Sequence, residues 1–121
     1  MISPTAKRDT TSDRMLLGKA LLNAGRAMGL TQAELADVVG RNRTGLVRDG
    51  VDPASKAGEL ALLFIRLYRS VYSLTGGDED AMQHWLDTRN RYFDAIPREL
   101  IQTAEGLVRV NHYLDAMRGR I

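Results

Sequence analysis

The sequence predicts an all-α fold of about seven helices. Apolar residues recur every three or four positions along most of the chain, and no convincing stretch alternates apolar and polar residues as a strand does. Glycine or proline separates the periodic segments. With 121 residues, 44% of them hydrophobic, the chain has the size and composition of a globular domain.

Composition excludes several classes of site. The chain has no cysteine, so disulfides and thiolate chemistry are excluded, and its two histidines cannot fill a zinc site without carboxylates. No glycine-rich phosphate loop or Ser/His/Asp order stands out, so we expect no enzyme, no cofactor and no metal. The N-terminus lacks the apolar core of a signal peptide, and no apolar run is long enough to span a bilayer. The expected compartment is the cytoplasm.

The beginning of the chain predicts a tail and two helices. Residues 1–11 are polar and predict a flexible tail, after which Ser12 or Asp13 can cap a helix that Gly29 ends. The inner face of this helix is expected to carry Met15, Leu16, Ala20, Leu21 and Ala24. Thr31 and Glu34 have the spacing of a capping box, which predicts a second helix up to a tight turn at Gly40.

A third short helix is expected over residues 42–49, with Leu46 and Val47 packing it against the preceding helix. Its Gly45 lowers helix stability by about 1 kcal/mol relative to alanine. Gly50 and Pro53 then mark an internal boundary, which divides the chain into units at residues 12–54 and 55–121.

The second unit begins with a long helix from Ser55 to about Leu74. Its apolar stripe covers most of its circumference, which predicts the central helix of the fold. Asp78 can cap the next helix, which carries Trp85, and Pro97 suits the first turn of another. Gly106 is expected to break or kink the pattern before a last helix that carries Leu107, Val110, Leu114 and Met117.

The two short helices around Gly40 indicate a helix-turn-helix, a motif that binds DNA. Residues 1–56 carry nine basic and six acidic residues, a net charge of +3, whereas residues 57–121 have a net charge of −1. Arginine and asparagine can recognise base edges, and hydroxyl and amide groups can bind phosphate. The candidate DNA-binding residues are Thr31, Gln32, Arg41, Asn42, Arg43, Thr44 and Arg48. The motif can also be a packing unit alone, which Gly45 and the acidic Asp49 favour.

The stretch LTQAELADVVGRNRTGLVRD, which begins at Leu30, resembles the Xre-type helix-turn-helix of bacterial regulators. From about residue 60 to residue 121, the chain resembles the toxin-binding domain of the MbcA/ParS/Xre antitoxin family. That resemblance rests on Trp85-Leu86, PRELIQTAEG at 97–106, Val110, Leu114 and Gly119. One departure is that Phe93-Asp94-Ala95 replaces the Leu-Gly-Gly turn of the family, so a different loop conformation is expected there.

The resemblance implies a partner. Antitoxins of this family bind RES-domain toxins, which consume NAD, and their C-terminal end lies at the entrance of the toxin's active site. The implied toxin-binding residues are Asn111, Asp115, Arg118, Gly119, Arg120 and Ile121. A site for a pyrophosphate-bearing dinucleotide accepts cations, which suits Arg118 and Arg120. The alternative is that these arginines only stabilise the negative end of the last helix.

The sequence therefore predicts an antitoxin that occludes a RES-type toxin, represses its own operon as a homodimer, and binds no membrane. The alternative is a stand-alone dimeric repressor whose C-terminal helices only dimerise, and an antitoxin without DNA binding is a third reading. His84 and His112 are expected on the surface or at an interface. Tyr68 and Tyr72 are expected in the core or at a dimer contact.

Overall fold

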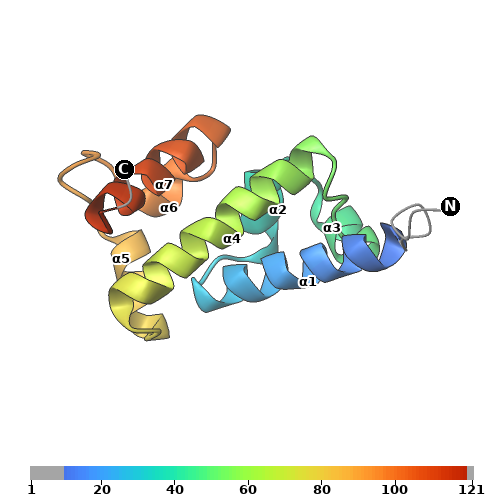
Figure 1. Ribbon diagram of the computed structural model, residues 1–121, viewed down its shortest axis with the longest axis horizontal. Coiled ribbons are helices and arrows are strands. Elements are labelled where there is room, and N and C mark those ends of the chain that lie inside the picture. Colours follow the sequence, from blue (N-terminus) through green and yellow to red (C-terminus); the bar gives the residue numbers. More distant parts are fainter. Residues whose placement is uncertain (1–9, 120–121) are drawn as a thin grey trace, which may run out of the picture.

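Figure 1 presents the computed structural model, which describes residues 10–119. Seven helices form this part of the chain, and its only β feature is an isolated bridge between Asn90 and Ala95. The predicted all-α class is therefore confirmed. The helices are α1 (Thr10–Ala27), α2 (Gln32–Val39), α3 (Arg43–Asp49), α4 (Lys56–Thr75), α5 (Glu79–Asp87), α6 (Pro97–Leu100) and α7 (Ala104–Met117).

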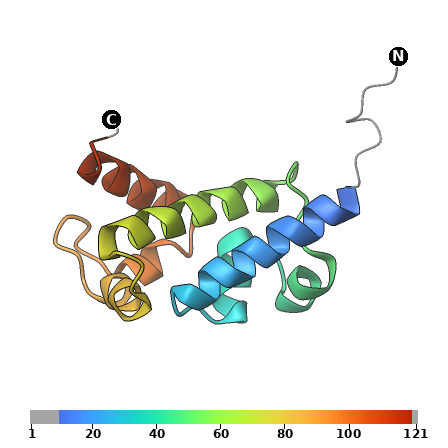
Figure 2. The same ribbon diagram turned by 60° about the horizontal axis from the view of Figure 1, so that its bottom comes forward.

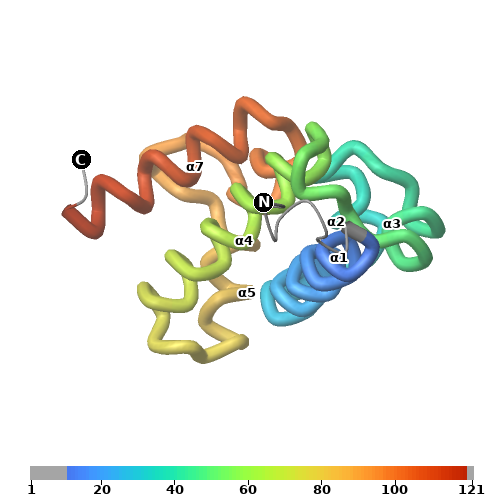
Figure 3. The backbone as a smooth tube through the Cα atoms, turned by 45° about the vertical axis from the view of Figure 1, so that its right-hand side comes forward, coloured from blue at the N-terminus to red at the C-terminus, as the bar shows by residue number. Residues whose placement is uncertain are grey.

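The long helix α4 is the centre of the fold, as its broad apolar stripe predicts. It packs against α1 and α2 on one side and against α5 and α7 on the other (Figure 1). Phe64 and Leu67 on α4 are fully buried, and they belong to one core with Leu21 of α1 and Leu107 of α7. Figure 3 shows the result: α1, α2 and α3 gather on one side of α4, and α7 lies on the other.

Side-chain caps begin α2, α3, α4 and α5, and the sequence predicts those at Thr31, Ser55 and Asp78. The Thr31 hydroxyl accepts a hydrogen bond from the Glu34 backbone N–H at 3.0 Å, and the Glu34 carboxylate accepts one from the Thr31 N–H at 2.9 Å. This capping box starts α2, and Gly40 ends the helix with a φ of 70°. Asn42, Ser55 and Asp78 likewise cap α3, α4 and α5.

Three expectations need correction. Helix α1 begins at Thr10, so Ser12 and Asp13 lie inside it, and residues 10 and 11 are helical rather than part of a tail; residues 1–9 lie outside the described part of the chain. Met15, Leu16 and Ala20 are exposed, because α1 buries the face that carries Leu17, Leu21 and Ala24.

The third correction concerns Gly106, which does not interrupt the last helix. The break lies at residues 101–103, and Gly106 sits in the first turn of α7, where its N–H donates to the Thr103 hydroxyl at 3.1 Å. A Cβ at this position would lie 1.8 Å from the Leu100 carbonyl oxygen. Glycine is therefore required by the close approach of α7 to the end of α6.

Within residues 10–119, no helix combines the length and the apolar character needed to cross a bilayer.

Candidate functional site

The surface formed by α3 and the start of α2 gathers four of the seven candidate DNA-binding residues. A shallow depression of about 450 Å³ is lined by Gln32, Arg43, Thr44, Val47 and Arg48. The connection from α2 to α3 has three residues and contains Gly40, as a helix-turn-helix requires. Leu46 is fully buried and holds α3 to the core, but Val47 is 44% exposed and does not pack inward as expected.

The other three candidates form local bonds that shape the backbone. Thr31 caps α2, and the Asn42 side-chain oxygen accepts from the Gly45 N–H at 2.7 Å. The Arg41 guanidinium donates to the Gly50 carbonyl oxygen at 3.3 Å, so it ties the start of α3 to its end. The structure thus places these side chains at the ends of the helices rather than in the depression.

Arg48 has a competing partner on its own helix. Its guanidinium donates two hydrogen bonds of 2.9 Å to the Asp49 carboxylate. This pairing raises the pKa of Arg48 and lowers the pKa of Asp49. Both side chains are well exposed, so the pair is weak and a phosphate can replace Asp49.

Polar side chains join α7 to the middle of α4. Asn111 is buried, and its amide donates to the Leu63 carbonyl oxygen at 3.2 Å. One turn later, the Asp115 carboxylate is buried and pairs with Arg66. The family resemblance described above implied that both residues contact the toxin. In this structure their polar groups instead face α4.

The end of α7 is exposed. Arg118 follows the last helical residue and donates to the Ser70 hydroxyl at 2.9 Å, and Gly119 has a φ of 71°. A positive φ of this kind ends a helix and turns the chain away from the helix axis. Arg120 and Ile121, the other two expected contacts, lie outside the described residues.

An aromatic cluster beside α7 was missed at the sequence level. The ring of Tyr92, 68% exposed, lies 4.7 Å from that of Tyr113, which lies 4.9 Å from the ring of Phe93. The Arg109 guanidinium lies 5.5 Å from the centre of the Phe93 ring. In the sequence, only the adjacent aromatic residues Tyr92 and Phe93 indicate this cluster. Their partners Arg109 and Tyr113 lie on α7, sixteen or more positions later in the chain.

The turn before α6 contains a residue in the left-handed backbone conformation that glycine usually adopts, although this residue is an aspartate. Asp94 has a φ of 54°, its N–H donates to the Asn90 carbonyl oxygen, and its carboxylate pairs with Arg89 at 2.9 Å. Aspartate is one of the few residues that adopt this conformation at modest cost. The replacement of Leu-Gly-Gly by Phe93-Asp94-Ala95 is therefore compatible with a left-handed turn.

Arg98 connects the two ends of the molecule. From the first turn of α6, its guanidinium donates to Glu34 on α2 at 3.0 Å, to the Gly29 carbonyl oxygen at 3.1 Å, and to Asp87 on α5 at 2.5 Å. The Thr31 N–H, as the main cause, and then Arg98 lower the pKa of the Glu34 carboxyl below its ordinary 4.5, although partial burial opposes them.

The two histidines lie on the surface, as one of the two expectations has it. His84 and His112 are both exposed, and no group of three or more potential ligands is found among residues 10–119.

Comparison with protein families shows which part of the chain resembles a known domain. Residues 70–120 match the model of the antitoxin Xre/MbcA/ParS C-terminal toxin-binding domain. This segment, 51 of the 121 residues, is similar to that antitoxin family. It begins at Ser70 in α4 and includes α5, α6 and α7, so the aromatic cluster, Arg98 and Arg118 all lie within the toxin-binding domain. The comparison with curated proteins found no match.

The match to a toxin-binding domain supports an antitoxin role in a toxin–antitoxin system and implies that the partner is a toxin. The matched segment starts ten residues later than the resemblance seen in the sequence, which began near residue 60. Helices α1, α2 and α3 therefore lie outside the matched domain, and the candidate DNA-binding surface must be argued from its own geometry.

Proposed function

We propose that this antitoxin binds a RES-type, NAD-consuming toxin in the cytoplasm and occludes its active site with the C-terminal end of α7. It acts by binding rather than by catalysis. In the same complex, a homodimer of the antitoxin binds operator DNA through two copies of α3 and represses its own operon. The observation that carries the proposal is that the matched toxin-binding domain ends in an exposed, cationic helix end.

The chemistry of this end supports occlusion of a dinucleotide site. The Arg118 guanidinium forms planar hydrogen bonds of the kind that bind carboxylates and phosphates. Its present partner is the neutral Ser70 hydroxyl, which a carboxylate of the toxin can replace. Gly119 ends the helix with a φ of 71°, and a second arginine, Arg120, follows it in the sequence.

Tyr92 and Arg109 supply a second contact area beside the same helix. Tyrosine and arginine are enriched among the residues that dominate protein interfaces, because they bury a large area with few rotatable bonds or form several hydrogen bonds. The Tyr92 ring is already held by Tyr113, so little conformational freedom is lost when a partner covers it.

The toxin proposal is tested by co-expressing the antitoxin with the protein encoded by the neighbouring gene, which the proposal expects to be a RES-type toxin. We expect growth arrest by the toxin alone, rescue by the intact antitoxin, and loss of rescue when residues 118–121 are deleted or Arg118→Glu is introduced. Arg26→Glu, at the exposed end of α1, is the matched control and should still rescue. Full rescue by both altered C-termini would contradict occlusion by this end.

The DNA proposal rests on the depression that gathers Gln32, Arg43, Thr44 and Arg48. In a mobility-shift assay with the DNA upstream of the operon, Arg43→Ala should weaken binding, and added salt should weaken it steeply because phosphate contacts release counterions. The control is Arg91→Ala, an exposed arginine in the toxin-binding domain. Equal affinity of the antitoxin for unrelated DNA would exclude specific recognition, and an absence of any toxin complex would favour the stand-alone repressor.

A further inference from the structure

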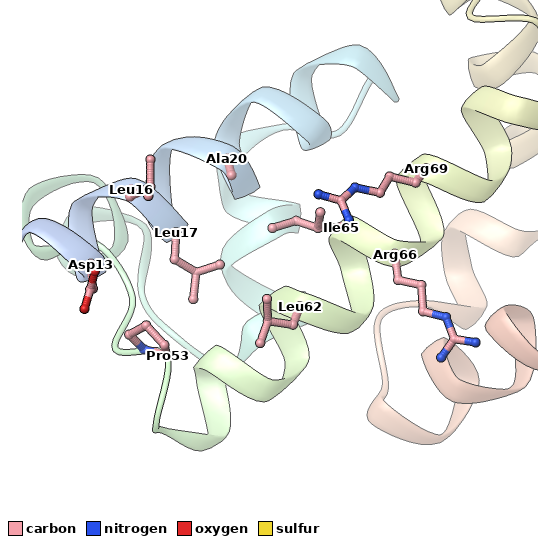
Figure 4. Close-up of a pocket in the computed structure, with 9 residues that line it drawn as sticks. All are labelled: Asp13, Leu16, Leu17, Ala20, Pro53, Leu62, Ile65, Arg66 and Arg69. Atoms are coloured by element: carbon pink, nitrogen blue, oxygen red, sulfur yellow. The ribbon is translucent and has the colours of Figure 1, made fainter. Parts of the chain in front are cut away.

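A groove between α1 and α4 leaves apolar side chains uncovered (Figure 4). Its floor and walls include Leu16, Leu17 and Ala20 of α1 and Leu62 and Ile65 of α4, and its volume is about 320 Å³. Leu16 is 69% exposed and Leu62 is 53% exposed. We refer to this surface as the α1–α4 groove.

The α1–α4 groove carries opposite charges at its two ends. Figure 4 shows Asp13 beside Pro53 at one end and Arg69 at the other. Arg66 also lines the arginine end, but it is paired with Asp115 of α7. Arg69 forms no ion pair with any residue in the described range 10–119, and its guanidinium extends over the groove near Ile65 (Figure 4).

Neither partner of the proposed function fits this groove. Every residue that lines it lies between positions 13 and 69, outside the toxin-binding segment that begins at residue 70. DNA binding requires cationic and polar groups along the contact, whereas the centre of this groove is aliphatic. The candidate DNA surface is formed instead by α3 and the start of α2.

We propose that the α1–α4 groove is the interface between two copies of this antitoxin. This inference rests on the homodimer of the proposed function and adds its location. A two-fold axis through the middle of the groove places each Asp13 against the Arg69 end of the other copy, so the charges are self-complementary. The same operation brings the two pairs of Leu16 and Leu62 together and removes them from water.

The first test is the mass of the full chain in solution. Sedimentation equilibrium should give a dimer for the natural protein and a monomer for Leu62→Glu, because the new carboxylates would be buried at the two-fold axis. Leu74→Glu, which alters a 42% exposed leucine on the same helix outside the groove, should remain a dimer. Circular dichroism should show unchanged helix content for both variants.

The second test exchanges the charges. Asp13→Arg and Arg69→Asp should each weaken the dimer about tenfold, because each change removes two exposed ion pairs from the symmetric interface. The variant with both changes should restore dimerisation, because the reversed charges are again complementary. If the double variant recovered none of the lost dimer affinity, the proposed ion pair between Asp13 and Arg69 would be contradicted.

The outcomes separate this inference from the proposed function. A dimer that survives Leu62→Glu would overturn the inference and leave the toxin and DNA proposals intact. A monomeric natural protein would overturn both the inference and the homodimer. If deletion of residues 1–9 then produced a dimer, the N-terminal segment rather than a second copy would be the occupant of the groove.

Discussion

Two asparagines show how differently the two ends of the molecule use polar side chains. Asn42 accepts a bond from Gly45, three residues later, and so shapes only the first turn of α3. Asn111 donates to the Leu63 carbonyl oxygen, 48 residues earlier, and so holds α7 to α4. Asn42 thus acts within one turn of a single helix, whereas Asn111 joins two helices that lie far apart in the sequence. Substitutions at matched positions should therefore have unequal effects.

The largest effect is expected at Gly106, in the first turn of α7. Gly106→Ala should lower the free energy of unfolding by about 3 kcal/mol or more, because its Cβ would meet a backbone oxygen that cannot move without displacing α6. Urea denaturation measures this change. A stable Gly106→Ala protein with unchanged co-expression rescue would show that the contact between α6 and α7 is not required.

The two asparagines provide the next comparison. Asn111→Ala should cost about 2 kcal/mol of stability, because it removes a buried amide that donates hydrogen bonds to the Leu63 and Leu107 carbonyl oxygens. Asn42→Ala should cost about 1 kcal/mol, the usual value of a lost N-cap. His112→Ala, an exposed neighbour on α7, is the control and should change stability little. Equal losses at Asn111 and His112 would contradict the role given to the buried amide.

Arg98 tests the connection between the two regions. Arg98→Ala should lower the free energy of unfolding by about 1.5 kcal/mol at neutral pH, after allowance for partial exposure of its partners. Since the pKa of Glu34 is lowered in the folded chain, its contribution is present above pH 4.5 and is lost as the pH falls through the folded pKa. The difference between the natural protein and Arg98→Ala should therefore shrink below pH 4.5, which urea denaturation at two pH values measures. A pH-independent difference would exclude this contribution of Glu34.

The smallest effect is expected at Gly45, which occupies in α3 the position that Gly106 occupies in α7. A Cβ here would meet only the ends of the Asn42 and Arg41 side chains, at 3.1 and 3.2 Å. Gly45→Ala should change stability between zero and a gain of about 1 kcal/mol, because alanine favours the helix. Thermal unfolding measures the change, and a large loss would show that the first turn of α3 is as tightly enclosed as that of α7.

This contrast also explains what the sequence could predict. The capping box of α2, the turn at Gly40 and the central position of α4 follow from residues that lie close together in the chain, such as Thr31 and Glu34, and these predictions are confirmed. The expected cap at Ser12 or Asp13 is wrong, because α1 begins at Thr10. The role of Gly106 was not, because the Leu100 oxygen that requires glycine reaches it only through the turn at residues 101–103. Likewise, the exposure of Arg43 follows from helix periodicity, but the cluster of Tyr92 with Tyr113 and Arg109 depends on how a loop folds back onto α7.

The rigid link through α4 sets the geometry of any larger assembly. Figure 2 shows α3 and α7 at opposite ends of the molecule, with α4 between them. Since α4 is one unbroken helix of 20 residues, it is about 30 Å long. Two macromolecules bound at α3 and α7 are thus kept at a constant separation, with no hinge to absorb a clash. A partner bound at α7 that extends further than the length of α4 would therefore collide with a partner bound at α3.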